Sequence, residues 1–199
     1  CFSSGMGAID AVMKLLRPGD EVITGDDLYG GSYRMFTKVF APFGIKFHFI
    51  DMKDTDVIKK HINANTKMIW LETPTNPTMQ IIDIEACSKI SKEHKLICAV
   101  DNTFASPYLC QPLKHGADFV VHSATKYLGG HADVMGGIVV ARDEVDLPAL
   151  SGVMKLVGGV LGVWEAHEIL RGLKTLAVRM DRQCENAASL ANYLSSQRT

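Results

Sequence analysis

Short apolar segments rich in β-branched residues recur along the chain and alternate with stretches of helical spacing. The apolar segments are residues 21–23, 46–50, 68–71, 96–100, 119–121 and 137–140. Between most of them, apolar residues recur every three or four positions, at residues 7–16, 33–40, 54–62 and 84–93. Buried strands that alternate with helices form a mostly parallel sheet covered on both faces. The sequence therefore predicts an α/β fold with three layers, α/β/α.

The pattern changes near Trp164, after which the chain reads as helical to its end. Apolar residues at a spacing of three to four include Leu170, Leu173, Leu176, Met180, Leu190 and Leu194. We expect a long C-terminal helix whose apolar stripe packs on a partner, and we expect Trp70 and Trp164 in the core. No repeat or linker interrupts the 199 residues, which favours one domain over residues 1–199.

The charge balance excludes several classes of partner. A formal net charge of -1 provides no basic field to attract nucleic acid or an anionic membrane surface. No apolar run approaches the length of a membrane span. None of the five cysteines forms a C-x-x-C pair, and Cys87 and Cys98 lie within apolar segments, which favours reduced thiols. We therefore expect a cytoplasmic protein with a small-molecule partner.

Polar residues follow three of the predicted strands at the point where each strand ends. E-T-P-T-N-P follows Leu71, D-N-T follows Val100, and H-S-A-T-K follows Val121. In an open parallel sheet, ligands bind beyond the carboxyl ends of the strands. Near the start, S-S-G-M-G-A leads directly into a helix, whose first N–H groups and dipole favour an anion. These features together predict a site for a phosphate-bearing ligand.

Pyridoxal phosphate is a cofactor whose requirements these groups meet. It needs a lysine for its aldehyde, an acid for its pyridine nitrogen and a flat side chain over its ring. Lys126 can form the Schiff base, Asp101 can keep the ring nitrogen protonated, and Tyr29 can stack on the ring. The expected phosphate donors are Ser123, Thr125 and the amides of Gly5 and Met6.

Other interpretations of the same residues compete with this one. Lys126 is either an ordinary structural cation or an amine held in a dry site for covalent chemistry, and only the ordered set of residues favours the second. Ser123 and Lys126 also match S-x-x-K, a signature of serine acyl transfer, but S-D-N is absent and residues 174–176 read K-T-L instead of K-T-G. The candidates for a metal site are His122, His131 and Asp133. Because no H-E-x-x-H or cysteine spacing supports such a site, we expect no metal.

Four motifs, L-Y-G-G, E-T-P-T-N-P, V-D-N-T-F and S-A-T-K-Y with G-G-H-x-D after it, occur along the chain. Together they resemble the Cys/Met-metabolism family of pyridoxal phosphate enzymes, which includes cystathionine lyases, cystathionine γ-synthase and methionine γ-lyase. The resemblance runs from Ser4 to Met180 and implies the large domain of fold type I. It also implies that Asn76 lies near the cofactor's phenolic oxygen, Thr103 near its ring and Arg34 in the substrate pocket. A homotetramer, built as a dimer of dimers, is a further implication.

The resemblance implies a trans-sulfuration enzyme. The first expectation is a carbon–sulfur lyase that converts cystathionine or cysteine-type substrates to a thiol amino acid, ammonia and a 2-oxo acid. Gly31 stands where methionine γ-lyases commonly resemble L-Y-G-C, which favours a cystathionine lyase, although Y-G-G-S-Y-R is also similar to cystathionine γ-synthase. The family's upstream Tyr-x-Arg segment and C-terminal small domain find no match here. We therefore expect the cofactor-binding domain alone, and a catalytically incomplete domain is the remaining alternative.

Overall fold

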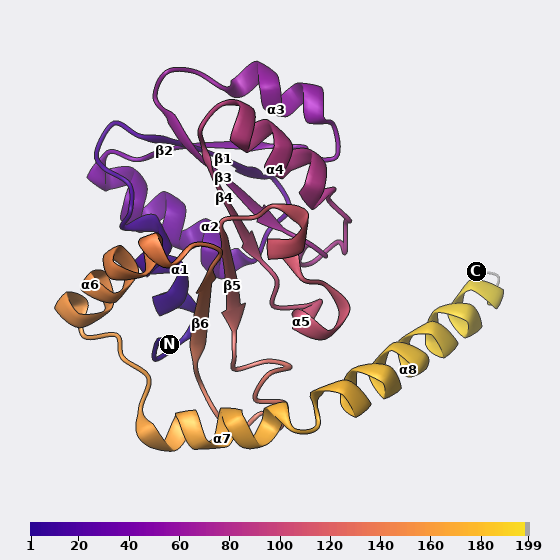
Figure 1. Cartoon of the computed structure of the whole chain (residues 1–199). Coiled ribbons are helices and arrows are strands. Elements are labelled where there is room, and N and C mark those ends of the chain that lie inside the picture. Colours follow the sequence, from indigo (N-terminus) through magenta and orange to yellow (C-terminus); the bar gives the residue numbers. More distant parts are fainter. Residues whose placement is uncertain (198–199) are drawn as a thin grey trace.

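A six-stranded sheet forms the centre of the computed structural model, which describes residues 1–197 (Figure 1). The strands are β1 (Glu21–Gly25), β2 (Lys46–Ile50), β3 (Thr66–Glu72), β4 (Ile97–Asp101), β5 (Phe119–Ser123) and β6 (Gly137–Ala141). They lie in the order β2-β1-β3-β4-β5-β6. The first five are parallel, and β6 runs antiparallel to β5. The prediction of a mostly parallel sheet is confirmed.

Helices cover both faces of this sheet. The α-helices of the described chain are α1 (Gly5–Met13), α2 (Gly30–Met35), α3 (Thr55–His61), α4 (Ile84–Glu93), α5 (Ser106–Leu109), α6 (Leu147–Val157), α7 (Val163–Leu173) and α8 (Leu176–Ser196), and not all of them pack on the sheet. A π-helical turn, Phe36–Phe40, continues α2. One buried cluster joins α1, the π-helical turn and α6 to one face, and a second joins α3 and α4 to the other. This is the predicted three-layer α/β/α arrangement.

Strand β3 shows why an uninterrupted apolar run was the correct signal for a central strand. Met68 and Trp70 belong to the cluster that includes α1, whereas Ile69 and Leu71 belong to the cluster that includes α4. All four side chains are fully buried. Successive side chains of a strand point to opposite faces, so a strand covered on both faces needs apolar residues at every position.

The predicted long C-terminal helix is present as α8, but the helical pattern that begins near Trp164 does not form one continuous helix. The chain forms two helices there, α7 and α8, which are separated at Lys174 and Thr175 and preceded by the unpredicted α6. Helix α8 has 21 residues, and its end projects away from the body of the molecule (Figure 1). Trp164 on α7 is 72% exposed, so its expected place in the core is wrong, whereas Trp70 is buried. The three-to-four spacing continues through both helices and therefore could not indicate the break.

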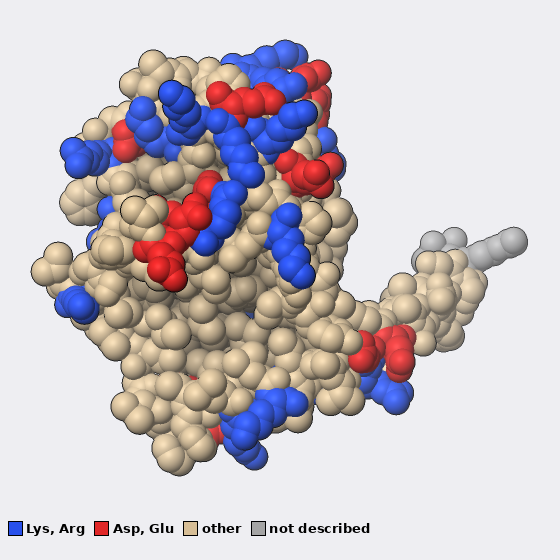
Figure 2. Space-filling model, viewed as in Figure 1, with Lys and Arg blue, Asp and Glu red and all other residues tan. Residues whose placement is uncertain are grey.

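The charged surface agrees with the near-zero net charge. Lys, Arg, Asp and Glu side chains gather over the upper part of the molecule in Figure 2, where α3 and α4 lie. Side chains of opposite sign are neighbours there, and the lower part of this face carries few charges. Among residues 1–197, no helix combines the length and apolar character needed to cross a membrane.

Candidate active site

A cavity of about 390 Å³ lies at the carboxyl ends of the central strands. Nine residues assigned from the sequence to a cofactor line it: Gly5, Met6, Tyr29, Asn76, Asp101, Thr103, Ser123, Thr125 and Lys126. They come from the start of α1, the loop before α2 and the segments that follow β3, β4 and β5. Segments far apart in the sequence thus meet where a parallel sheet places its ligands.

The start of α1 has the features of a phosphate seat. Ser4 is its N-cap residue, and the hydroxyl oxygen of Ser4 accepts the N–H of Gly7 at 3.0 Å. Helix geometry leaves the amides of Gly5 and Met6 without an intrahelical acceptor, at the positive end of the helix dipole. A side chain at the first of these positions is excluded, because a Cβ on Gly5 would lie 2.7 Å from the Cβ of Ser123. This close approach keeps the Ser123 side chain beside the helix start.

Asp101 is oriented by Thr103. The backbone N–H and the hydroxyl of Thr103 donate to Asp101 Oδ1 at 3.0 and 2.5 Å, and the same hydroxyl oxygen accepts the N–H of Ser123 at 2.9 Å. No donor within residues 1–197 contacts Asp101 Oδ2, which is left to the cavity. Burial raises the pKa of Asp101, against the effect of the hydrogen bonds from Thr103. A cationic partner at Oδ2 would therefore stabilise the carboxylate.

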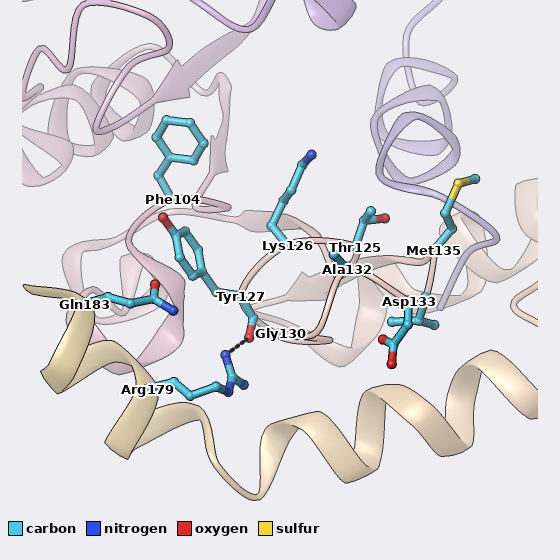
Figure 3. A pocket seen from close by; sticks show the side chains of 11 residues that line it. Phe104, Thr125, Lys126, Tyr127, Gly130, Ala132, Asp133, Met135, Arg179 and Gln183 are labelled. Atoms are coloured by element: carbon cyan, nitrogen blue, oxygen red, sulfur yellow. Dashed lines mark hydrogen bonds between the residues drawn. The ribbon is translucent and has the colours of Figure 1, made fainter.

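Lys126 lies where two cavities meet. It lines the cavity above and a second one of about 570 Å³, which is bordered by the loop after β5 and by α8 (Figure 3). Phe104, Thr125 and Met135 also line both cavities. The Lys126 side chain is exposed in this chain. Residues 1–197 alone therefore do not provide the dry surroundings that were expected for its amine.

The loop after β5 is attached to the junction of α7 and α8 by Arg179. The guanidinium of Arg179 donates to the carbonyl oxygens of Tyr127 and Gly172, both at 2.9 Å, and to the hydroxyl of Thr175 at 3.0 Å. Figure 3 shows the bond to Tyr127. The guanidinium packs directly on Gly130, where a Cβ would lie 2.3 Å from Arg179 Cζ. No motif in the sequence marks Arg179, so its contacts were not predicted.

Glu72 is a second residue that was not predicted from the sequence, and it lines the first cavity. It ends β3, and its carboxylate oxygens accept the N–H groups of Tyr29 at 2.8 Å and Asn76 at 2.9 Å. Burial and the charge of Asp101 raise the pKa of Glu72 to about 8, although the two N–H groups act in the opposite direction. Its one signal in the sequence is its place at the strand end, as the first letter of E-T-P-T-N-P.

Of the two residues assigned from the sequence near α2, Tyr29 lines the cavity and Arg34 does not. Tyr29 is the N-cap residue of α2, is 41% exposed and lines the cavity. Its ring lies over Gly31, where a Cβ would be 2.2 Å from Tyr29 Cε1. Arg34, further along α2, is exposed and is not part of the cavity lining. A contact between Arg34 and a substrate therefore stays a prediction.

The competing interpretations find no support in the described part of the chain. No group of three or more His, Cys, Asp or Glu side chains in residues 1–197 could hold a metal ion. His122 is buried, and burial lowers its pKa to about 4, while His131 Nδ1 bonds its own loop at the Gly129 carbonyl. The backbone N–H of Lys126 donates to the Ser123 carbonyl at 3.1 Å, but within residues 1–197 the two side chains form no hydrogen bond with each other, as a serine nucleophile and its base would.

An α/β domain that gathers a lysine, a buried aspartate and a helix start at the carboxyl edge of its sheet is typical of enzymes that use pyridoxal phosphate. The chain belongs to the Cys/Met metabolism PLP-dependent enzyme family, whose sequence model matches residues 1–199. This finding confirms the resemblance noted in the sequence. Pyridoxal 5'-phosphate is accordingly the cofactor that family membership assigns to the chain.

Individual relatives include both synthases and lyases. The chain is 47% identical over 196 residues to the cystathionine gamma-synthase/O-acetylhomoserine (thiol)-lyase of Bacillus subtilis (strain 168), covering 98% of the chain and 52% of that protein. It is also 47% identical over 195 residues to the cystathionine gamma-lyase of that organism, with the same coverage of 98% and 52%. A crystal structure of cystathionine gamma-lyase from Lactobacillus plantarum complexed with L-serine matches with a TM-score of 0.97 at 43% identity, over 98% of this chain and 51% of that one. The chain spans about half the length of these relatives.

Proposed function

We propose that residues 1–199 form the pyridoxal phosphate-binding domain of a carbon–sulfur lyase that acts on cystathionine or cysteine-type substrates. The observation that carries this proposal is a single cavity lined by Lys126, Asp101 and the start of α1, in a chain of this family. In the overall reaction, substrate and one water give a thiol amino acid, ammonia and a 2-oxo acid.

The chemistry of the cavity fits this cofactor. When bound, pyridoxal phosphate supplies an electron sink for the bond to the substrate's α-hydrogen. Lys126 would hold the cofactor's aldehyde carbon, and once displaced by the substrate amine its Nζ would be free to accept the α-proton as a general base. Asp101 would keep the ring nitrogen protonated through Oδ2, the oxygen that Thr103 leaves free. Tyr29 would provide a flat side chain for the ring and would assist the leaving thiol.

The remaining lining residues bind and orient. Ser123, Thr125 and the amides of Gly5 and Met6 would bind the phosphate, for which the α1 dipole would provide additional stabilisation. Asn76 would donate toward the phenolic oxygen, and Thr103 orients the acid that would serve the ring nitrogen. Arg34 is assigned to the substrate side, on the resemblance alone.

The particular family member is a finer proposal. We infer a cystathionine lyase first, with cystathionine γ-synthase or methionine γ-lyase as the alternatives, because Gly31 differs from the L-Y-G-C pattern. The equal identity to a synthase/thiol-lyase and to a lyase does not separate the first two. We also propose a homotetramer in the cytoplasm. Exposed apolar side chains on α6 and α7, such as Leu156 at 90% and Val163 at 90%, support burial against further protein.

The cofactor site is tested with Lys126→Ala and, as a matched control, Lys174→Ala, an exposed lysine outside both cavities. The chain titrated with pyridoxal phosphate should develop a visible absorbance band, and borohydride should then fix the cofactor's mass on the peptide that contains Lys126. Lys126→Ala should lose both signals and Lys174→Ala should keep both. Equal labelling of all three proteins would show that the cavity is not the site.

The reaction is tested with cystathionine, methionine and an activated homoserine ester as substrates of the loaded protein. Release of a 2-oxo acid from cystathionine supports the lyase, and consumption of the ester together with cysteine supports the synthase. Cofactor bound at Lys126 without turnover of any of the three would favour a catalytically incomplete domain.

A further inference from the structure

Glu72 connects the two loops that place Tyr29 and Asn76 on the cavity. One carboxylate oxygen accepts the N–H of Tyr29 at 2.8 Å, and the other accepts the N–H of Asn76 at 2.9 Å. Tyr29 lies 43 residues away in the sequence, before α2, and Asn76 lies only four residues away, after β3. The carboxylate is therefore a bridge between separate segments and not a local turn.

The position of Glu72 in the sheet makes this bridge rigid. Glu72 is the last residue of β3 and is paired in register with Asp101, the last residue of β4. The two acids therefore leave adjacent strand ends on the same edge of the sheet. A side chain anchored on a central strand holds its partners with less freedom than one on a loop.

Both oxygens of the carboxylate are needed for this arrangement. Two N–H donors point at one side chain, and the carboxyl group offers a separate oxygen to each of them. A glutamine offers one oxygen and presents its NH₂ group to the second donor, so one of the two backbone N–H groups loses its partner. The acid stands beside Asp101, and burial and that neighbouring charge both raise the pKa of Glu72.

The neighbouring acid Asp27 shows that the same two loops are joined a second time, outside the cavity. Its carboxylate accepts the hydroxyls of Thr75 and Thr78 and the N–H of Thr78, but Asp27 is not part of the cavity lining. Asp27 thus contributes to loop attachment, whereas Glu72 bonds the backbone of two residues that line the cavity.

We propose that Glu72 is a positioning residue of the cofactor site, whose carboxylate sets the Tyr29 ring and the Asn76 side chain on the cavity by holding their backbone N–H groups. This inference rests on the proposed function, because it assigns the two positioned residues to the cofactor. Glu72 itself takes no part in the bond-making steps.

The test compares Glu72→Gln with Glu21→Gln, a control at the opposite end of the sheet. Glu21 is also a strand-terminal acid with side-chain partners, His48 and Asn63, and is far from the cavity lining. Amide hydrogen exchange is measured by NMR on the protein without cofactor, and the dissociation constant for pyridoxal phosphate is measured by absorbance titration. Thermal unfolding is recorded for all proteins.

Glu72→Gln should speed exchange at one of the two amides, Tyr29 or Asn76, and should weaken cofactor binding by up to about 10-fold, the equivalent of one hydrogen bond that no longer positions a lining residue. Glu21→Gln should change neither quantity, even where it lowers the unfolding temperature. The proposal is overturned if both amides stay protected in Glu72→Gln, or if their exchange rises while cofactor affinity equals that of the wild type.

The two proposals fail in different ways. If the wild type binds pyridoxal phosphate through Lys126 and Glu72→Gln binds it equally well, the role of Glu72 is wrong and the cofactor site stands. If borohydride fixes no cofactor on Lys126 in the wild type, the site itself is wrong, and the role of Glu72 falls with it.

Discussion

Replacing Gly31 by alanine tests whether the Tyr29 ring covers the cofactor. A Cβ at Gly31 would lie 2.2 Å from Tyr29 Cε1, 2.8 Å from Tyr29 Cζ and 3.0 Å from Met6 Sδ. Carbon atoms in contact prefer about 3.5–4.0 Å, so the ring must move by more than about 1 Å. Gly31 is buried in the first turn of α2, so the ring, as the more mobile partner, is what gives way.

The magnitude follows from the proposed stack. An offset aromatic pair is worth about 0.5–1.5 kcal/mol beyond its buried area, so its loss weakens cofactor binding by about 2- to 10-fold. Alanine also favours the helix over glycine by up to about 1 kcal/mol. Gly30→Ala is a matched control for that gain, because a Cβ there meets only the terminal Nη1 of Arg34, at 3.2 Å. The difference between the two variants isolates the displaced ring.

The assay is an absorbance titration of Gly31→Ala, Gly30→Ala and the wild type with pyridoxal phosphate, accompanied by thermal unfolding of each unloaded protein. Gly30→Ala should bind as the wild type does, and Gly31→Ala should bind more weakly. Equal affinity of the two variants would refute the reasoning, because a ring displaced by this distance cannot keep its stack. Weaker binding by both would instead point to a requirement for glycine in the helix start itself.

Three further predictions concern stability. Glu72 has a pKa of about 8 in the folded chain and an ordinary value when unfolded, so between about pH 4.5 and 8 the folded state holds an extra proton. The folded state therefore loses stability as pH rises through this window. In urea unfolding, Glu72→Gln should reduce the pH dependence of the unfolding free energy by up to about 1.4 kcal/mol per pH unit. His122, whose pKa is lowered to about 4, acts in the other direction, and stability should fall as pH drops from about 6.5 to 4, with a smaller slope in His122→Asn. Gly137→Ala should cost at least about 1–3 kcal/mol of unfolding free energy, because its Cβ would lie 2.0 Å from the backbone oxygen of Ser4, while Gly152→Ala, with open space around it, should be neutral or stabilising. An unchanged unfolding midpoint in Gly137→Ala would contradict the packing described for α1.

The strands and the residues at their ends could be predicted because both depend on local sequence. Burial on two faces demands an apolar run such as 68–71, and a ligand edge demands polar groups directly after it. Glu72 and Arg179 could not be predicted from such patterns. Their partners are backbone groups 43 and 52 residues away, at Tyr29 and Tyr127, and backbone N–H and C=O groups leave no mark on residue type. Only the assembled fold brings them together.

The break between α7 and α8 was also beyond local pattern, for a different reason. Hydrophobic spacing indicates which face of a helix is buried, but it does not indicate where the helix axis changes direction. Gly172 marks the turn in the structure, because a Cβ there would lie 2.1 Å from the carbonyl oxygen of Gly129. The chain changes direction close to the point where the backbone of α7 contacts the backbone at Gly129. A single glycine in the sequence does not indicate such a contact.

The hydrogen bonds of Arg179 connect α8 to the loop that carries Lys126. Helix α8 extends for about 30 Å, and Arg179 near its base grips the Tyr127 carbonyl, one residue beyond Lys126. A tilt of the outer turns of α8 would move Arg179, and through its hydrogen bond to Tyr127 it would shift the backbone next to Lys126. A partner that binds the outer turns of α8 would therefore also change how firmly the backbone at Lys126 is held.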